Sequence, residues 1–254
     1  MDFETVLEHH IIDHTYRFAH VFGLNVPLTK HLAMMWLVGL ILAVIVPLVY
    51  RSKARALWPL RAAIEGLVEF VRHDIVLDNM GEAGLRYTPY FCTVFFFILG
   101  CNLAGLVPYG STATGNISVT AALAVMSLVF ILFAGMREQG VAAYFKTLVP
   151  HGVPGWLVPL LFPIELFGLL TKAFALCIRL FANMISGHIV LLSFIMMIFI
   201  FAQVNIVVDV LGVIPGQLVM ALFVMLLEVF VAFLQAFIFT FLTAIFAGMA
   251  MHPH

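Results

Sequence analysis

The 254-residue chain is 64% hydrophobic and only 10% charged, and its formal net charge is -1 at pH 7. Soluble domains are about 45–50% apolar and about 25% charged, so this composition predicts an integral membrane protein whose solvent is lipid. The low net charge excludes a basic surface for nucleic acid. The three cysteines lie in apolar runs without metal-ligand spacing, and we interpret them as packing or lipid-facing residues: Cys92, Cys101 and Cys177.

The first 30 residues are expected to be an N-terminal segment on the outer side of the membrane. Acids and histidines stand where a secretory signal would carry Lys or Arg, so we expect no cleaved leader. Five histidines invite a metal-binding interpretation, but they lack cysteine or carboxylate support at ligand spacing, and we expect a solvated segment without a bound metal. These residues are His9, His10, His14, His20 and His31.

The first membrane span is predicted at residues 31–50, because an uncharged run of about 20 residues can cross the hydrocarbon core. A basic cluster follows it, and the positive-inside rule puts that cluster on the cytoplasmic or matrix side, with the N-terminus outside. Residues 55–80 repeat apolar side chains at helical spacing between charges. They predict an amphipathic helix on the inner membrane surface, or alternatively a short helix packed on protein.

Residues 87–136 contain no Asp, Glu, Lys or Arg and are long enough to span twice. Turn-forming residues from Pro108 to Asn116 break the run, so it predicts a two-helix hairpin. Two long helices are expected at 156–203 and 206–251, with the C-terminus inside. The first would be about twice as long as the hydrocarbon core is thick, so it is either steeply tilted or broken near residues 183–187.

Arg179 is the central candidate, because it stands inside a long apolar run. An arginine at the bilayer centre costs at least about 2.5–3.5 kcal/mol, and its guanidinium does not lose its proton in proteins. Glu165, Lys172 and Arg179 are spaced seven and seven, so a helix would carry them on one face, with Asn183 one turn further on. Glu165 lies too far along the axis to be a salt-bridge partner and suits the mouth of an aqueous cavity.

The second long helix carries a lone carboxylate, Glu228, and Gln235 seven residues later on the same face. In a hairpin, His188 would lie at a similar depth to Glu228, and such a pair can pass protons near neutral pH. Gln235 would lie near the depth of Arg179. Asn102 and Asn116, on the outer side of the shorter hairpin, either line the same cavity or hydrogen-bond neighbouring helices.

Several stretches together resemble subunit a of F-type ATP synthases. The most distinctive is IELFGLLTKAFALCIRLFANMISGHIVL, supported by LGCNLAGLVPY, TGNISVTAALAV and EVFVAFLQAFIFTFLTAIF. They cover about the last two-thirds of the chain in the expected order. The resemblance implies an all-α integral membrane protein of about five membrane helices plus a surface amphipathic helix. It also implies that the last two helices form a long, strongly tilted hairpin against a rotating c-ring.

The same resemblance implies the roles of the site residues. Arg179 would face the c-ring carboxylates, Glu165 would lie in the inner half-channel, and Gln235 would lie near the arginine. Many bacterial members carry Glu and His where this chain has His188 and Glu228, and the exchanged pair resembles mitochondrial and alphaproteobacterial members. The pair is expected in the outer half-channel.

The function implied is a proton-translocating stator subunit that couples proton flow to rotation and ATP synthesis, without catalytic chemistry or cofactor in this chain. Its expected partners are the c-ring, the b subunits of the peripheral stalk, the rest of the F1Fo complex and membrane lipid. The expected location is the bacterial inner membrane, or alternatively the mitochondrial inner membrane. Two other classes of membrane protein make different sequence predictions. A secondary transporter with an arginine anion site would show inverted repeats and broken half-helices, and a haem-bearing cytochrome would need histidine pairs at membrane depth.

Overall fold

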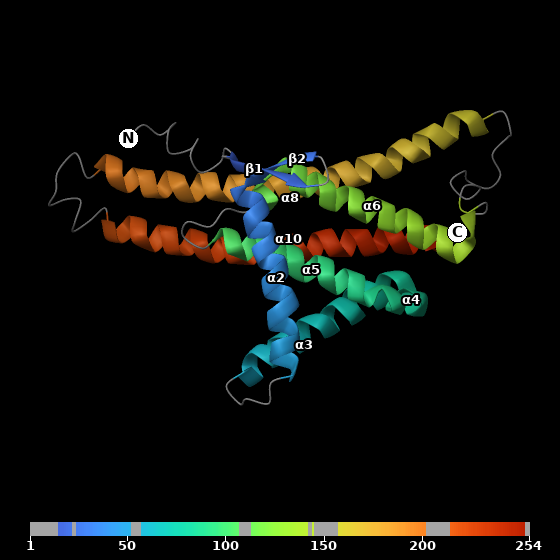
Figure 1. The fold of residues 1–254 in the computed structure, drawn as a ribbon, viewed down its shortest axis with the longest axis horizontal. Helices are drawn as coiled ribbons and strands as arrows, with labels where there is room; N and C mark the ends of the chain where they lie inside the picture. Colours follow the sequence, from blue (N-terminus) through green and yellow to red (C-terminus); the bar gives the residue numbers. More distant parts are fainter. Residues whose placement is uncertain are drawn as a thin grey trace. The chain divides into compact units, whose positions relative to one another are not determined.

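The computed structural model describes residues 15–21, 24–51, 57–106, 113–141, 144, 157–201 and 214–251. Within these ranges the chain is dominated by helices, and Figure 1 shows their order along the sequence. Four described stretches are long and apolar enough to cross a membrane: His31–Arg51, Trp58–Gly105, Ile117–Gln139 and Val219–Met251. The prediction of a helical, multi-pass membrane protein is therefore confirmed. His9, His10 and His14, and residues 202–213 between the two long helices, lie outside the described residues.

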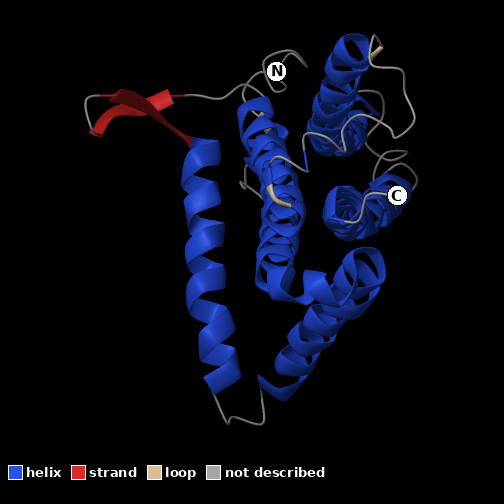
Figure 2. Cartoon of the chain, turned by 90° about the vertical axis from the view of Figure 1, so that its right-hand side faces the viewer, coloured by secondary structure: helices blue, strands red, loops and turns tan. Residues whose placement is uncertain are grey.

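The N-terminal segment contains a feature that the sequence did not predict. Strands β1 (Thr15–Val21) and β2 (Leu24–Thr29) pair antiparallel, and α2 (Lys30–Arg51) begins directly after β2. Figure 2 shows this hairpin as the only strands among the described residues. Phe18, Val21 and Val26 favour strand conformation, but the histidines and charged residues around them interrupt the alternation of apolar and polar residues by which a strand is predicted.

The segment expected to be a single amphipathic helix is more complex. It consists of α3 (Trp58–Phe70), a π-helical stretch η2 (Val71–Leu77) and α4 (Asp78–Gly84). No residue of α3 is buried, whereas Val71 and Ile75 of η2 are completely buried. The first half of the segment is therefore exposed and the second half is packed on protein, and the position of the segment on a membrane surface stays a prediction. Within α4, Gly81 has φ 66°, a conformation that favours glycine.

A short 3-10 turn, η3 (Leu85–Tyr87), leads into α5 (Thr88–Gly105). A second 3-10 turn, η4 (Ala113–Gly115), precedes α6 (Ile117–Gln139). These two helices occupy the range predicted for the shorter hairpin, and the turn-forming residues lie between them. Arg86 of η3, just before α5, and Glu138 near the end of α6 form an ion pair.

The two remaining helices are α8 (Val158–Phe201) and α10 (Ile214–Met251). Of the two alternatives for the first of them, the structure has the unbroken one: α8 is a single helix of 44 residues. At about 1.5 Å per residue it is about 66 Å long, roughly twice the thickness of a hydrocarbon core of about 30 Å. Helix α10 has Pro215 in its first turn, where a missing N–H costs nothing.

The chain forms two compact units, whose boundary crosses α8 after Arg179 and α10 after Gln235. The first contains the β hairpin, the start of α2, residues 98–116 and residues 180–235. Its core includes Ile98, Leu180 and the polar Gln235. The second contains residues 41–97, 117–179 and 236–254. Its core includes Phe91, Phe95 and Phe239, all completely buried.

Candidate functional site

The polar face predicted for α8 exists as a row of charges on one side of a continuous helix. Glu165, Lys172 and Arg179 follow each other at seven-residue intervals, which keeps them within about 20° per step on one face. Glu165 and Arg179 are exposed, and Lys172 is half-buried. The Lys172 ammonium lies 5.0 Å from the centre of the Phe246 ring. This cation–π contact gives Lys172 a structural role in packing α8 against α10.

Arg179 carries a charge that no described residue of the chain neutralises. Its guanidinium is exposed, and it forms no hydrogen bond or ion pair with any residue that the structure describes. Its neighbours on α8 are apolar, with Ile178 exposed and Cys177 and Leu180 buried. A permanent cation on such a surface needs water or an anion supplied from outside the described part of the chain.

One turn beyond Arg179, a side-chain hydrogen bond joins α8 to α10. The Asn183 Nδ2 donates to the Gln235 Oε1 over 2.7 Å, and Gln235 is only 1% exposed. This places the glutamine of α10 beside the turn of α8 that follows the arginine. The bond also fixes the amide of Gln235, because its oxygen already accepts.

Glu228 lies against the backbone of α8 at Gly187. A methyl group built on Gly187 would come within 2.8 Å of the Glu228 Oε1, so the carboxylate occupies the space that the missing side chain leaves. Gly187 directly precedes His188 in the chain. The predicted partners therefore lie at the same level of the two helices. The His188 side chain itself is outside the described part of the chain, and the pairing stays a prediction.

Asn102 has the contacts of a residue that holds helices together. It is completely buried, its Nδ2 donates to the Ala232 carbonyl of α10 over 3.4 Å, and its Oδ1 accepts from the Thr114 hydroxyl over 2.7 Å. Both ends of the amide are thus occupied within the first unit. Asn116 is half-buried, and its backbone N–H donates to the Ala113 carbonyl over 3.2 Å at the start of α6.

At the other end of the charged row, Glu165 is close enough to Tyr144 for its charge to affect the phenol electrostatically. Burial raises the pKa of the Tyr144 phenol, and the negative charge of Glu165 raises it further. Tyr144 is 4% exposed and lies against Gly135, where an added methyl group would come within 2.5 Å of the ring. In the second unit, Glu165 thus stands exposed beside a buried phenol.

Two residues of this region were missed by the sequence interpretation. Gly187 is one of them. Its position inside a helical pattern was a usable signal, because glycine destabilises a helix interior by about 1 kcal/mol relative to alanine and often marks a place where another group packs closely. Thr114 is the other, and it stood unnoticed among turn-forming residues. Within the described residues, no group of three or more His, Cys, Asp or Glu is placed to hold a metal ion.

Long apolar helices with a row of ionisable side chains define a multi-pass membrane protein of the kind that moves ions. Comparison with known proteins gives the particular family. The family described as "ATP synthase A chain" matches residues 32–248. ATP synthase subunit a 2 of Chlorobium luteolum is 42% identical over 262 residues, covering 96% of this chain and 75% of its own.

Two further relatives agree. ATP synthase subunit a of Pelodictyon phaeoclathratiforme is 43% identical, covering 96% of this chain and 75% of its own. That of Anaeromyxobacter dehalogenans is 45% identical over 230 residues, covering 89% and 58%. The chain belongs to the ATP synthase A chain family. It is thus a proton-translocating membrane subunit of an F-type ATP synthase, a non-catalytic part of that complex.

Proposed function

We propose that this chain provides two offset half-channels that bring protons from opposite sides of the membrane to the carboxylates of a c-ring. The observation that carries the proposal is Arg179, an exposed cation in an apolar stretch of α8 without a partner among the described residues. Such a charge is costly unless an anion meets it. A ring that presents one carboxylate after another would supply that anion.

The outer half-channel is proposed to end at Glu228 and His188. The support is the contact of the Glu228 carboxylate with Gly187, which brings the acid to the level of the neighbouring histidine. An imidazole can take up and release a proton close to neutral pH, and a carboxylate beside it can accept that proton or hold it by a hydrogen bond. Asn102 and Asn116 belong to the walls of this region, and the bonds of Asn102 give it a positioning role.

The inner half-channel is proposed to pass Glu165. Its carboxylate is exposed, and it lies on the same face of α8 as Arg179, 14 residues away, or about 21 Å along the axis. A proton leaving the ring would reach this carboxylate after nearly a full rotation. Each charge that crosses is driven by about 2.3 kcal/mol per 100 mV, in addition to the pH difference.

Arg179 separates the two paths. Its guanidinium keeps the facing ring carboxylate ionised, and because it does not release its own proton it cannot pass one directly between the half-channels. The bond from Asn183 to Gln235 holds α8 and α10 together one turn away, and this supports a fixed position for the cation.

The proposal includes the surroundings of the chain. We place the N-terminus outside and the C-terminus inside a bacterial inner membrane, with the c-ring against Arg179 and the b subunits of the peripheral stalk as further neighbours. The basic residues after α2 support this orientation through the positive-inside rule. The transporter alternative requires helices broken at membrane depth, whereas α8 and α10 are continuous over their described lengths.

The test is the replacement of Arg179 in the assembled ATP synthase. Arg179→Ala should abolish ATP-driven proton pumping in inverted membrane vesicles while the complex still assembles. It should also make the vesicles leak protons passively, because nothing then separates the half-channels. Lys172→Ala, one heptad away and explained by packing on Phe246, is the matched control and should retain most of the pumping. Normal coupled pumping by Arg179→Ala would refute the proposal.

A further inference from the structure

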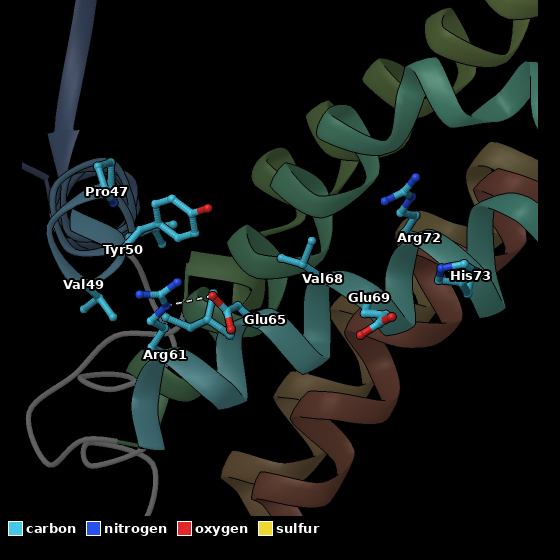
Figure 3. A pocket seen from close by; sticks show the side chains of 11 residues that line it. Pro47, Val49, Tyr50, Arg61, Glu65, Val68, Glu69, Arg72 and His73 are labelled. Carbon is cyan, nitrogen blue, oxygen red and sulfur yellow. Dashed lines mark hydrogen bonds and ion pairs between the residues drawn. The ribbon is translucent and has the colours of Figure 1, made fainter. Parts of the chain in front are cut away.

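A groove unrelated to the proton path lies in the second unit, between the last turns of α2 and one face of α3 and η2. It encloses about 400 Å³. Figure 3 shows it from close by, with Val49 and Tyr50 on one wall and Arg61, Glu65 and Val68 on the other. The residues on the α3–η2 side recur every three or four positions, so a single helix face is turned toward the groove.

The interior of the groove is apolar and the rim is charged. Val46, Val49, Ile64 and Val68 contribute aliphatic surface to the lining. These four side chains carry no polar group, so the surface that they line suits a hydrocarbon chain rather than a polar solute. The groove is therefore built for a molecule with an apolar body and a polar end.

The rim charges fall into two sets. Arg61 and Glu65 satisfy each other, because the Arg61 Nε donates to the Glu65 Oε1 over 2.8 Å, and the guanidinium also lies 5.0 Å from the centre of the Tyr50 ring. Glu69, Arg72 and His73 are exposed and form no hydrogen bond or ion pair with any described residue. One free carboxylate and one free guanidinium, with an imidazole beside it, thus stand within one helical turn.

The backbone that carries Arg72 and His73 is unusual. Both belong to the π-helical stretch Val71–Leu77, a conformation that is rare and occurs frequently at functional sites. The opposite side of this stretch is fixed, since Val71, Ile75 and Val76 are all completely buried. The guanidinium of Arg72 and the imidazole of His73 are therefore carried by a segment whose opposite side is packed in the protein.

The groove lies beside the C-terminal end of α2, where the residues are typical of a membrane–water interface. Arg51 ends α2, and two aromatic residues at the same end are strongly exposed, Tyr50 at 65% and Trp58 at 71%. Tyrosine and tryptophan concentrate at membrane–water interfaces. A lipid molecule at this level would offer its glycerol and headgroup to the rim and one acyl chain to the apolar wall.

We infer that the groove binds one ethanolamine phospholipid, with an acyl chain along the valines and Ile64, the phosphate at Arg72 and His73, and the ammonium at Glu69. The charges select this headgroup. A glycerol headgroup has no cation for Glu69, which would repel its phosphate. A choline headgroup has a cation without N–H donors, so it cannot hydrogen-bond the carboxylate.

The test uses the full chain in nanodiscs that contain ethanolamine, choline and glycerol phospholipids in equal amounts and with the same acyl chains. After transfer to a mild detergent, the retained phospholipid is quantified by mass spectrometry. The wild-type chain should keep close to one ethanolamine phospholipid and little of the others. Glu69→Gln should lower the ethanolamine-to-choline ratio about two- to fivefold, and Arg72→Gln should lower retention of both.

The matched control is Glu82→Gln, which removes an exposed carboxylate of α4 outside the groove and should leave the ratio unchanged. Equal retention of the three lipids, a preference for the glycerol lipid, or an equal effect of Glu82→Gln and Glu69→Gln would overturn the inference. A second measurement uses the intact ATP synthase. If the complex lacks the ethanolamine lipid and the Val68→Cys variant cross-links to a partner subunit, the inference is overturned and the groove is a protein interface.

Discussion

Replacing Gly187 by alanine should disturb Glu228 without disturbing the fold. The added methyl group would lie 2.8 Å from the Glu228 Oε1, and ordinary contact begins at 3.4 Å, so the carboxylate must retreat by at least 0.6 Å. The atom that moves is the far end of a flexible side chain, and the backbone can stay in place. Gly187→Ala is therefore a displacement of the acid rather than its removal.

The expected magnitudes differ for stability and transport. Rotating Glu228 away from its preferred rotamer costs about 0.5–1.5 kcal/mol, while Gly→Ala in a helix interior returns about 0.5–1 kcal/mol, so the net change in stability should be close to zero. A misplacement of about 1 Å in a reacting group can cost about 100-fold in rate. For a shift of this smaller size we expect proton pumping to fall roughly tenfold.

The assay is ATP-driven quenching of a pH-sensitive dye in inverted membrane vesicles, together with the thermal stability of the purified complex. Gly168→Ala is the matched control, because it makes the same change on α8 at a position with no atom within 4 Å of the new methyl group. Adding Glu228→Asp to Gly187→Ala shortens the acid and should recover part of the pumping. Unchanged pumping by Gly187→Ala, or an equal loss in Gly168→Ala, would refute the reasoning.

Three further predictions concern stability, and each is checked by thermal unfolding in detergent. Asn183→Ala and Gln235→Ala should be coupled by about 0.6 kcal/mol in a double-mutant cycle, as for other hydrogen bonds between membrane helices, and additive losses would contradict their bond. Asn102→Ala should cost about 1–3 kcal/mol, because it leaves the buried Thr114 hydroxyl without its acceptor; a neutral effect would contradict this. Gly248→Ala should cost about 1–3 kcal/mol, since the methyl group would collide with the Asn79 carbonyl oxygen, which is backbone; unchanged stability would show that the segment yields.

The sequence predicted the helical class and the approximate ranges of the membrane helices because charge and hydropathy decide which segments can enter lipid. The common face of Glu165, Lys172 and Arg179 could also be predicted, because residues seven positions apart lie on nearly the same side of a helix. The level of Gln235 followed from the lengths of two helices that run side by side. These inferences need only the period of a helix and the thickness of a bilayer.

What the sequence could not provide depends on contacts between distant elements. Whether Asn102 lines a cavity or bonds a neighbouring helix is decided by Ala232, which is 130 residues away. The space for Glu228 is decided by a glycine on another helix. The π-helical stretch has no known short motif, and the β1–β2 hairpin pairs residues whose composition is closer to that of a solvated segment.

The charge of Arg179, which has no partner among the described residues, has a consequence for the stability of the subunit before it assembles into the complex. A newly inserted chain would expose this guanidinium to lipid at a cost of about 2.5–3.5 kcal/mol or more, and under the proposed function the docking of a ring carboxylate would remove that cost. Assembly and stability would then be linked by mass action, as for any protein stabilised by its ligand. Under that proposal, cells that synthesise this chain alone should degrade it quickly, and the residue proposed to face the ring would also report whether the complex has been completed.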